Sequence, residues 1–223
     1  MATASSSSSL SISRLIMVPA VITLGVTILR LVGELRHWSP LLFNTSAGGG
    51  AAIIGIAWLP FIFGPYFALK FAGAGEGPSS AGKAIGFAVL GILLTLGGSI
   101  VGFAPNITFP GKLLVGCLIM AGGVAVPLSA WPGLGKALLA YGYAARIPVA
   151  LVMFFAIRAS WGTHYDALPP GYTGPLDFWG KYFMIGLVPQ LVFWVAYTVV
   201  LGSLCGGIAA AIKGRRRSAA PAV

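Results

Sequence analysis

The stretch ALLAYGYAARIPVALVMFFAI, residues 137–157, contains one charged residue, Arg146, and is otherwise uncharged and mostly apolar. Its 21 residues would form a helix about 31 Å long at ~1.5 Å per residue, which matches the ~30 Å hydrocarbon core of a bilayer. Lys136 and Arg158 flank it, as positive residues often flank spanning helices. These features predict a membrane-spanning helix.

The composition of the whole chain agrees with this local prediction. Of its 223 residues, 57% are hydrophobic and 8% are charged, and the mean hydropathy is +0.93. Soluble domains carry about 25% charged residues, so this composition excludes an ordinary water-soluble fold. The 32 glycines and 15 prolines lie largely within apolar runs, where spanning helices tolerate them. We therefore expect an all-α, polytopic membrane protein.

Six apolar runs are each close to the ~20 residues that a spanning helix needs. They predict a bundle of six transmembrane helices over residues 15–212, with a structured outer loop. A disordered Ser-rich tail is expected at 1–14 and a basic tail at 213–223. We expect the first run to be a retained helix, because no small-residue cleavage pattern follows it. The six predicted spans are 15–33, 49–71, 84–103, 113–131, 137–157 and 183–212.

Six spans would place both termini on the same side of the membrane. Divided on this basis, eight basic residues of the loops and tails fall on the side of the termini and five on the other. The excess predicts cytoplasmic termini in a plasma or bacterial inner membrane. The basic run from Lys213 to Arg217 is expected to bind anionic lipid. We expect no nucleic-acid partner, because the other basic residues are scattered at the ends of apolar runs.

The longest polar interruption is RASWGTHYDALPPGYTGPLDFWGKY, residues 158–182. It holds two of the four acidic residues and one of the two histidines. Its Pro-Gly turns at 169–171 and 173–175 predict a structured cap over the outer ends of the helices. A short interfacial helix is expected over 176–182, with Asp177 near its start.

Arg146 is the most informative single residue. Inside a membrane its charge costs at least about 2.5 kcal/mol unless it faces water or a partner, and no predicted span contains Asp or Glu. Gln190 is expected at a similar depth on the next helix. One hypothesis is that Arg146, Gln190 and Tyr143 line a polar cavity that holds an anionic or strongly accepting ligand. The alternative is a structural arginine bonded to carbonyls that prolines leave free.

A metal site on the outer face is a weaker hypothesis. Glu34, His37, His164 and Asp166 would supply nitrogen and oxygen ligands suited to zinc, iron or manganese, but none has the spacing of a metal motif. We expect neither a metal nor a cofactor. Motifs for acyl-transfer, metalloprotease and nucleotide chemistry are also missing from the sequence.

Three functions remain open from the sequence. The leading one is a non-enzymatic small transporter or channel-like carrier with its polar site around Arg146 and Gln190. The second is a structural or accessory subunit, or a homo-oligomer, that assembles through glycine-rich helix faces such as those of Gly98-x-x-x-Gly102 and Gly202-x-x-x-Gly206. The third is a membrane-embedded enzyme with an outer-face site at His37, His164 and Asp166.

Overall fold

The structure is a computed structural model that describes residues 10–49 and 52–219, with the side chains of 216–219 left aside. All regular secondary structure in these ranges is helical, which confirms the predicted all-α class. The long helices are α1 (Ile12–Leu35), α3 (Ala81–Phe103), α4 (Lys112–Ala130), α5 (Pro132–Ala159) and α7 (Trp194–Ala219). The shorter elements are η1 (Ala47–Gly49), α2 (Pro60–Gly73), α6 (Phe178–Lys181) and the π-helical segments η2 (Tyr182–Leu187) and η3 (Pro189–Phe193).

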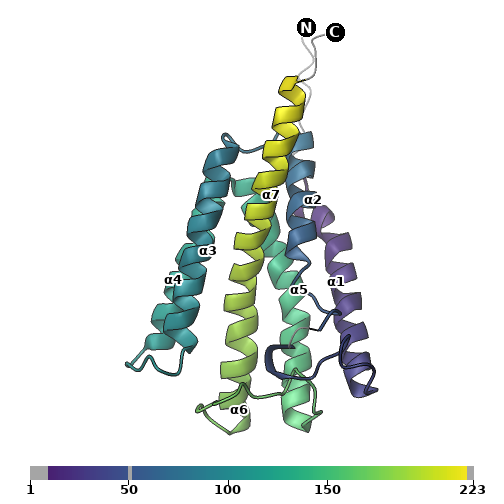
Figure 1. Cartoon of the computed structure of the whole chain (residues 1–223), viewed down its shortest axis with the longest axis vertical. Coiled ribbons are helices and arrows are strands. Elements are labelled where there is room, and N and C mark those ends of the chain that lie inside the picture. The colour runs from purple at the N-terminus through teal and green to yellow at the C-terminus, as the bar shows by residue number, and fades with distance from the viewer. Residues whose placement is uncertain (1–9, 50–51, 220–223) are drawn as a thin grey trace.

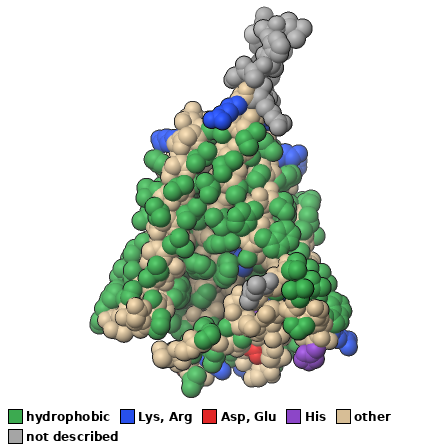
Figure 2. Space-filling view, in the orientation of Figure 1, with side chains coloured by type: hydrophobic (Ala, Val, Ile, Leu, Met, Phe, Trp, Pro, Cys, Tyr) green, Lys and Arg blue, Asp and Glu red, His purple; other side chains and the backbone are tan. Residues whose placement is uncertain are grey.

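Five helical segments in the described ranges are long and apolar enough to cross a membrane. They are α1, α3, α4, α5 and the continuous segment Phe178–Arg215, which joins α6, η2 and η3 to α7. Figure 2 shows hydrophobic side chains over most of the visible face between the two ends. A water-soluble protein would not expose this much contiguous apolar surface, so the five helices indicate a membrane-embedded protein.

The helix predicted for residues 49–71 begins only at Pro60. Gly48 and Gly49 adopt positive φ angles of 71° and 84°, and residues 52–59 form bends and turns. At ~1.5 Å per residue the 14 residues of α2 measure about 21 Å, which is shorter than the ~30 Å apolar core of a bilayer. The sequence predicted the apolar character of this run but missed its break, because the run of glycines lowers helix propensity without interrupting hydropathy.

The helices alternate in direction along the bundle (Figure 1). The start of α1 and the end of α7 lie at the same end, and the segment Ser160–Asp177 lies at the other. The hairpin of α3 and α4 packs beside α7, which also contacts α2 and α5, and α1 packs against α5. Figure 1 shows the hairpin leaning away from α1 and α5 toward the end that carries α6.

Glycine contacts hold the helices close together inside the bundle. A Cβ added at Gly116 of α4 would lie 2.7 Å from the Cα of Gly102 in α3. A Cβ at Gly64 of α2 would collide with the backbone of Gly202 in α7. Both predicted small-residue motifs, the one at Gly98 and the one at Gly202, therefore pack within this chain, where missing side chains let the backbones approach.

An aromatic cluster fills the middle of the bundle on the side of the termini. Tyr141 of α5 is 1% exposed and lies edge-on to the rings of Phe63 and Phe67, 5.3 and 5.7 Å from their centroids. Its hydroxyl bonds to the Thr23 hydroxyl of α1 at 2.8 Å. Because Tyr141 lies five residues before Arg146 on the same helix, this cluster closes the bundle on the terminal side of that arginine.

Candidate ligand-binding cavity

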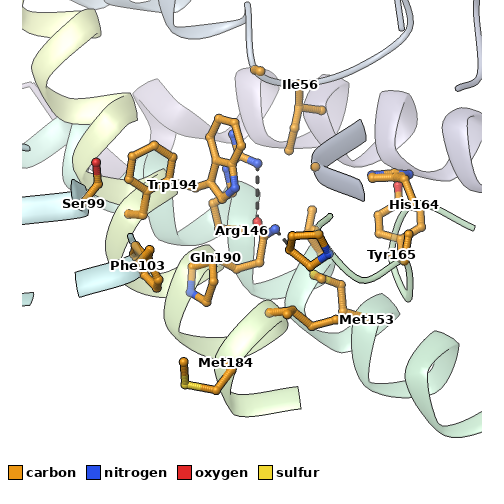
Figure 3. Close-up of a pocket in the computed structure, with 18 of the residues that line it drawn as sticks. Ile56, Ser99, Phe103, Arg146, Met153, His164, Tyr165, Met184, Gln190 and Trp194 are labelled. Atoms are coloured by element: carbon orange, nitrogen blue, oxygen red, sulfur yellow. Dashed lines mark hydrogen bonds between the residues drawn. The ribbon is translucent and has the colours of Figure 1, made fainter. Parts of the chain in front are cut away.

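A cavity of about 590 Å³ lies in the half of the bundle that is remote from the termini. Its walls come from the second half of α1, the last turn of α3, α5, the loop after α5, the π-helical segments and the start of α7. Gly48, Ile56 and Ala57 from the segment before α2 complete them. This volume is within the range of ~300–1,000 Å³ typical of small-molecule sites. Figure 3 shows Arg146, Gln190 and Trp194 near its centre, between Phe103 on one side and His164 on the other.

Arg146 is buried in this cavity without a carboxylate partner. Arg146 is 4% exposed, and no Asp or Glu of the described residues forms an ion pair with it. Nη1 donates a long hydrogen bond of 3.4 Å to Oε1 of Gln190, and Nε has no hydrogen-bond partner within the described chain. The guanidinium carbon lies 4.5 Å from the centroid of the Trp194 ring, a cation–π distance. The charge is thus oriented by neighbours but not neutralised.

The irregular helix geometry around Gln190 places its amide toward Arg146. Pro189 cannot donate a backbone hydrogen bond, and it opens the π-helical segment η3, which contains Gln190. Gln190 is 8% exposed, and its Nε2 donates to the sulfur of Met153 at 3.5 Å. Single π-helical turns within longer helices occur often at functional sites because they change the direction of the side chains.

The structure brings two of the three predicted binding residues together. Arg146 and Gln190 meet in the cavity, whereas Tyr143 is 41% exposed and is not part of its wall. Tyr143 lies three positions before Arg146 on the helix, so a small error in the assumed helix face moves the tyrosine outside the cavity. The tyrosine that does reach the cavity is Tyr165 of the loop, which is 3% exposed and donates to the carbonyl of Thr27 at 3.4 Å.

A second buried arginine, Arg30, also contacts the cavity, but all its nitrogens are bonded. Nε donates to Oε1 of Glu34 at 2.7 Å. Nη1 donates to the carbonyl of Ile54 at 3.0 Å, and Nη2 donates to those of Asn44 and Gly49 at 2.9 and 2.8 Å. Arg30 therefore holds the irregular segment before α2 against α1. The sequence indicated the pair with Glu34 from the i,i+4 spacing, but it gave no sign of the carbonyl partners.

Glu34 joins this segment to the loop after α5. It is 2% exposed and accepts hydrogen bonds from the backbone nitrogen and the Nδ1 of His164, at 2.8 and 2.5 Å. Burial lowers the pKa of the His164 imidazole below its usual value of 6.5, although the hydrogen bond to Glu34 opposes the shift. His164 is therefore neutral near pH 7 and donates to the carboxylate from Nδ1.

The four metal-ligand candidates do not assemble. Glu34 and His164 meet, but His37 is exposed in a left-handed conformation with φ 52° at the end of α1. Asp166 accepts from the backbone nitrogens of Gly162 and Thr163 at 2.9 and 2.8 Å and so caps its own turn. Among the residues with described placement, no three His, Cys, Asp or Glu side chains form a group that could hold a metal ion.

The loop from residue 160 to 177 closes the end of the cavity. His164, Tyr165, Ala167 and Pro169 form part of the cavity wall. The predicted short helix is confirmed as α6, and the carboxylate of Asp177 accepts from the backbone nitrogen of Gly180 at 2.9 Å at its start. The loop is therefore held at both of its ends and covers the polar site.

Comparison with protein families, with curated proteins and with solved structures found no match for this chain. A buried guanidinium with an unused N–H and no counter-charge can bind an anion or a strongly polarised acceptor. Its N–H groups are hydrogen-bond donors and cannot serve as a general base near neutral pH.

Proposed function

We propose that this protein is a small membrane carrier whose intramembrane site, at Arg146 and Gln190, binds an anionic group of its ligand. The observation that carries the proposal is the buried guanidinium of Arg146, which lines the cavity and has no carboxylate partner within the part of the chain that the structure describes. An unpaired charge taken out of water costs several kcal/mol. An anion that enters the cavity would offset much of this cost through its binding energy. A purely structural arginine would instead offset the cost through hydrogen bonds to carbonyls.

Arg30 supports this distinction between the two arginines. It has a similar burial, yet it is saturated by Glu34 and three carbonyls. The chain can therefore neutralise a buried arginine where the role is structural. Arg146 has one weak amide acceptor and an aromatic face instead.

We propose that the chain crosses the membrane six times, with both termini in the cytoplasm. Residues 52–59 and α2 would together make the second crossing, as an irregular half followed by a helical half. Irregular backbone at membrane depth is tolerated where it lines a cavity, and Ile56 and Ala57 do line this one. Carriers commonly bind their ligands at such interrupted helices.

Basic residues at the end of the bundle that carries the termini support this orientation. A second cavity, of about 830 Å³, lies at the end that carries the termini, and Lys213 and Arg215 are in its wall. We propose that the basic residues there bind the headgroups of anionic lipids, which are enriched on the cytoplasmic side.

A carrier role accounts for the cavity better than a docking role. The glycine motifs that would serve an accessory subunit already pack inside the chain. The cluster around Tyr141 closes the cavity toward the termini, so the site is not reachable from that end in this conformation. The π-helical segments between Tyr182 and Phe193 supply the irregular geometry at which a helix can bend when access changes sides.

Cysteine labelling tests the cavity. Cys117 and Cys205 are first replaced by alanine, and Gln190→Cys is then treated with a membrane-impermeant, polar thiol reagent. We expect labelling of Gln190→Cys and none of Val199→Cys, which lies on the same continuous helix and is 0% exposed. Equal absence of labelling at the two positions would show that water does not reach the site and would reject the carrier.

Replacing Arg146 tests its role directly. Arg146→Leu removes an unpaired buried charge, so we expect thermal stability to be unchanged or higher. A structural arginine would instead give a loss of several kcal/mol, because its bonded partners would be left unsatisfied. Arg158→Leu, at the exposed end of the same helix, is the matched control.

A further inference from the structure

We infer that the ligand of this cavity is a lipid-like amphiphile with a single negative charge and an apolar tail, which enters sideways from the bilayer. This inference rests on the proposed function, because it assigns a chemical class to the ligand that Arg146 binds. Three features of the cavity lead to it: the distribution of polar groups, the number of free charges, and the position of the mouth.

Most polar groups of the cavity lie at its centre and toward the loop. Arg146 and Gln190 meet at its centre, and His164 and Tyr165 lie on the side of the loop (Figure 3). The wall opposite the loop is formed mainly by apolar side chains from α3 and the π-helical segments, namely Ile100, Phe103, Met184 and Phe193. The one hydroxyl described on it, that of Ser99, already donates to the carbonyl of Leu96 at 2.8 Å. A small hydrophilic anion would leave this apolar wall facing water, whereas an alkyl or aryl tail would cover it at about 25 cal/mol per Å².

The free charge in the cavity amounts to one cation. Arg30 is neutralised by Glu34 and bonded at every nitrogen. His164 donates to the same carboxylate and is uncharged near pH 7. Arg146 alone lacks an anionic partner among the described residues, so a headgroup with one negative charge, such as a carboxylate or a phosphodiester, balances the site.

The mouth of the cavity is on the side of the bundle. Ile100 of α3 lines the cavity and is also 58% exposed, so it stands where the cavity meets the outer surface. At the end of the bundle His164 and Tyr165 cover the cavity, and Pro169 is the loop residue of its wall that is exposed. Figure 2 shows the visible face hollowed in its lower half, with hydrophobic side chains around it. A mouth at this level opens toward acyl chains, from which an amphiphile can enter tail and headgroup together.

The test measures contact between the ligand and Trp194, whose ring lies against Arg146. The full chain in nanodiscs is titrated with 2-bromododecanoate, because bromine next to the headgroup quenches a tryptophan that it touches. We expect saturable quenching that is absent in Trp194→Phe, which keeps an aromatic ring but removes the reporter. Arg146→Gln should weaken this binding by ~10-fold or more, since a charge-assisted hydrogen bond and its ion pair are lost. Arg158→Gln, an exposed arginine of the same helix, should not.

Competition separates the sources of affinity. Dodecanoate should displace the probe, whereas dodecanol, which lacks the charge, and butyrate, which lacks the tail, should each compete at least ~10-fold less well. Butyrate competing as strongly as dodecanoate would overturn the amphiphile and leave an anion carrier intact. Dodecanol competing as strongly would overturn the role of the charge. Labelling at Gln190→Cys with no saturable binding of the brominated probe would reject this inference alone, whereas absence of labelling at Gln190→Cys would reject the proposed function.

Discussion

Replacing Glu34 by glutamine should destabilise the protein more than any other single change of charge in it. The Glu34 side chain is fully buried and accepts from Arg30 at 2.7 Å and twice from His164, at 2.8 and 2.5 Å. Glutamine keeps the shape of the side chain, but its NH₂ group places one hydrogen-bond donor against another. Because the amide is neutral, it also leaves the charge of Arg30 uncompensated. Breaking a buried ion pair in this way costs about 3–5 kcal/mol. At about 2–4 °C per kcal/mol, the melting temperature should fall by roughly 6–20 °C.

The assay is thermal unfolding in detergent, followed with a dye that reacts with the thiols of Cys117 and Cys205 as the bundle opens. Glu76→Gln is the matched control, because Glu76 is exposed and its carboxylate accepts only a 3.3 Å hydrogen bond from the backbone of Leu10 among the contacts described. We expect the control to change the melting temperature by less than about 2 °C. A shift in Glu34→Gln as small as that of the control would refute the role of Glu34 as the link between α1 and the loop.

Two further changes test the loop and the helix contacts. Because burial holds the pKa of His164 below 6.5, the unfolded chain takes up more protons between the two pKa values, so the free energy of unfolding should decrease as the pH falls below about 6.5. Thermal unfolding at pH 7.5 and 5.5 checks this, and a decrease that persists in His164→Asn would assign it to another group. Gly116→Val should cost several kcal/mol or prevent folding, because its new side chain meets the Gly102 backbone, whereas Gly86→Val, which faces open space, should cost under about 1 kcal/mol. Equal losses of stability or yield in the two glycine variants would argue against the close packing of α3 and α4.

Much of the fold follows from hydropathy alone. The runs at 84–103 and 137–157 lie inside α3 and α5, and the run at 113–131 extends one residue beyond α4. A long apolar run between charged or proline-rich turns has few alternatives to a helix in a bilayer. The run at 49–71 shows the limit of this reasoning. A hydropathy profile does not distinguish a helix from an irregular apolar segment. The irregular segment before Pro60 is stabilised by the side chain of Arg30, which is distant in the sequence.

The predicted tails are only partly comparable with the structure. Residues 1–9 and 220–223 lie outside the described ranges. Of the remaining terminal residues, Ile12 to Arg14 already belong to α1, and α7 continues through the basic run to Ala219. Polar and basic residues at the ends of a spanning helix do not stop it from continuing, because its backbone remains hydrogen-bonded in water as in lipid.

The candidate site was predictable as far as Arg146 and Gln190, since both are polar residues at matching depths on consecutive helices. Tyr143 was misplaced relative to the cavity because the choice of helix face depended on a neighbour that the sequence does not specify. Trp194 and the loop residue Tyr165 were missed for a related reason. Their contacts with Arg146 and Thr27 depend on the π-helical register and on the fold of the loop, and neither has a sequence signal.

The comparison of the two buried arginines shows why composition could not assign a function. Arg30 and Arg146 are 8% and 4% exposed, and each lies in a helix that contains few other charges. Near Arg30 the backbone is not helical, and the carbonyls of Asn44, Gly49 and Ile54 accept hydrogen bonds from the guanidinium. Near Arg146 two prolines, at 148 and 189, also perturb the backbone, yet the hydrogen bonds described for its guanidinium include no carbonyl. The same residue type is thus neutralised by the protein at Arg30 and has no anionic partner among the described residues at Arg146, and only the arrangement of acceptors around each guanidinium distinguishes the two.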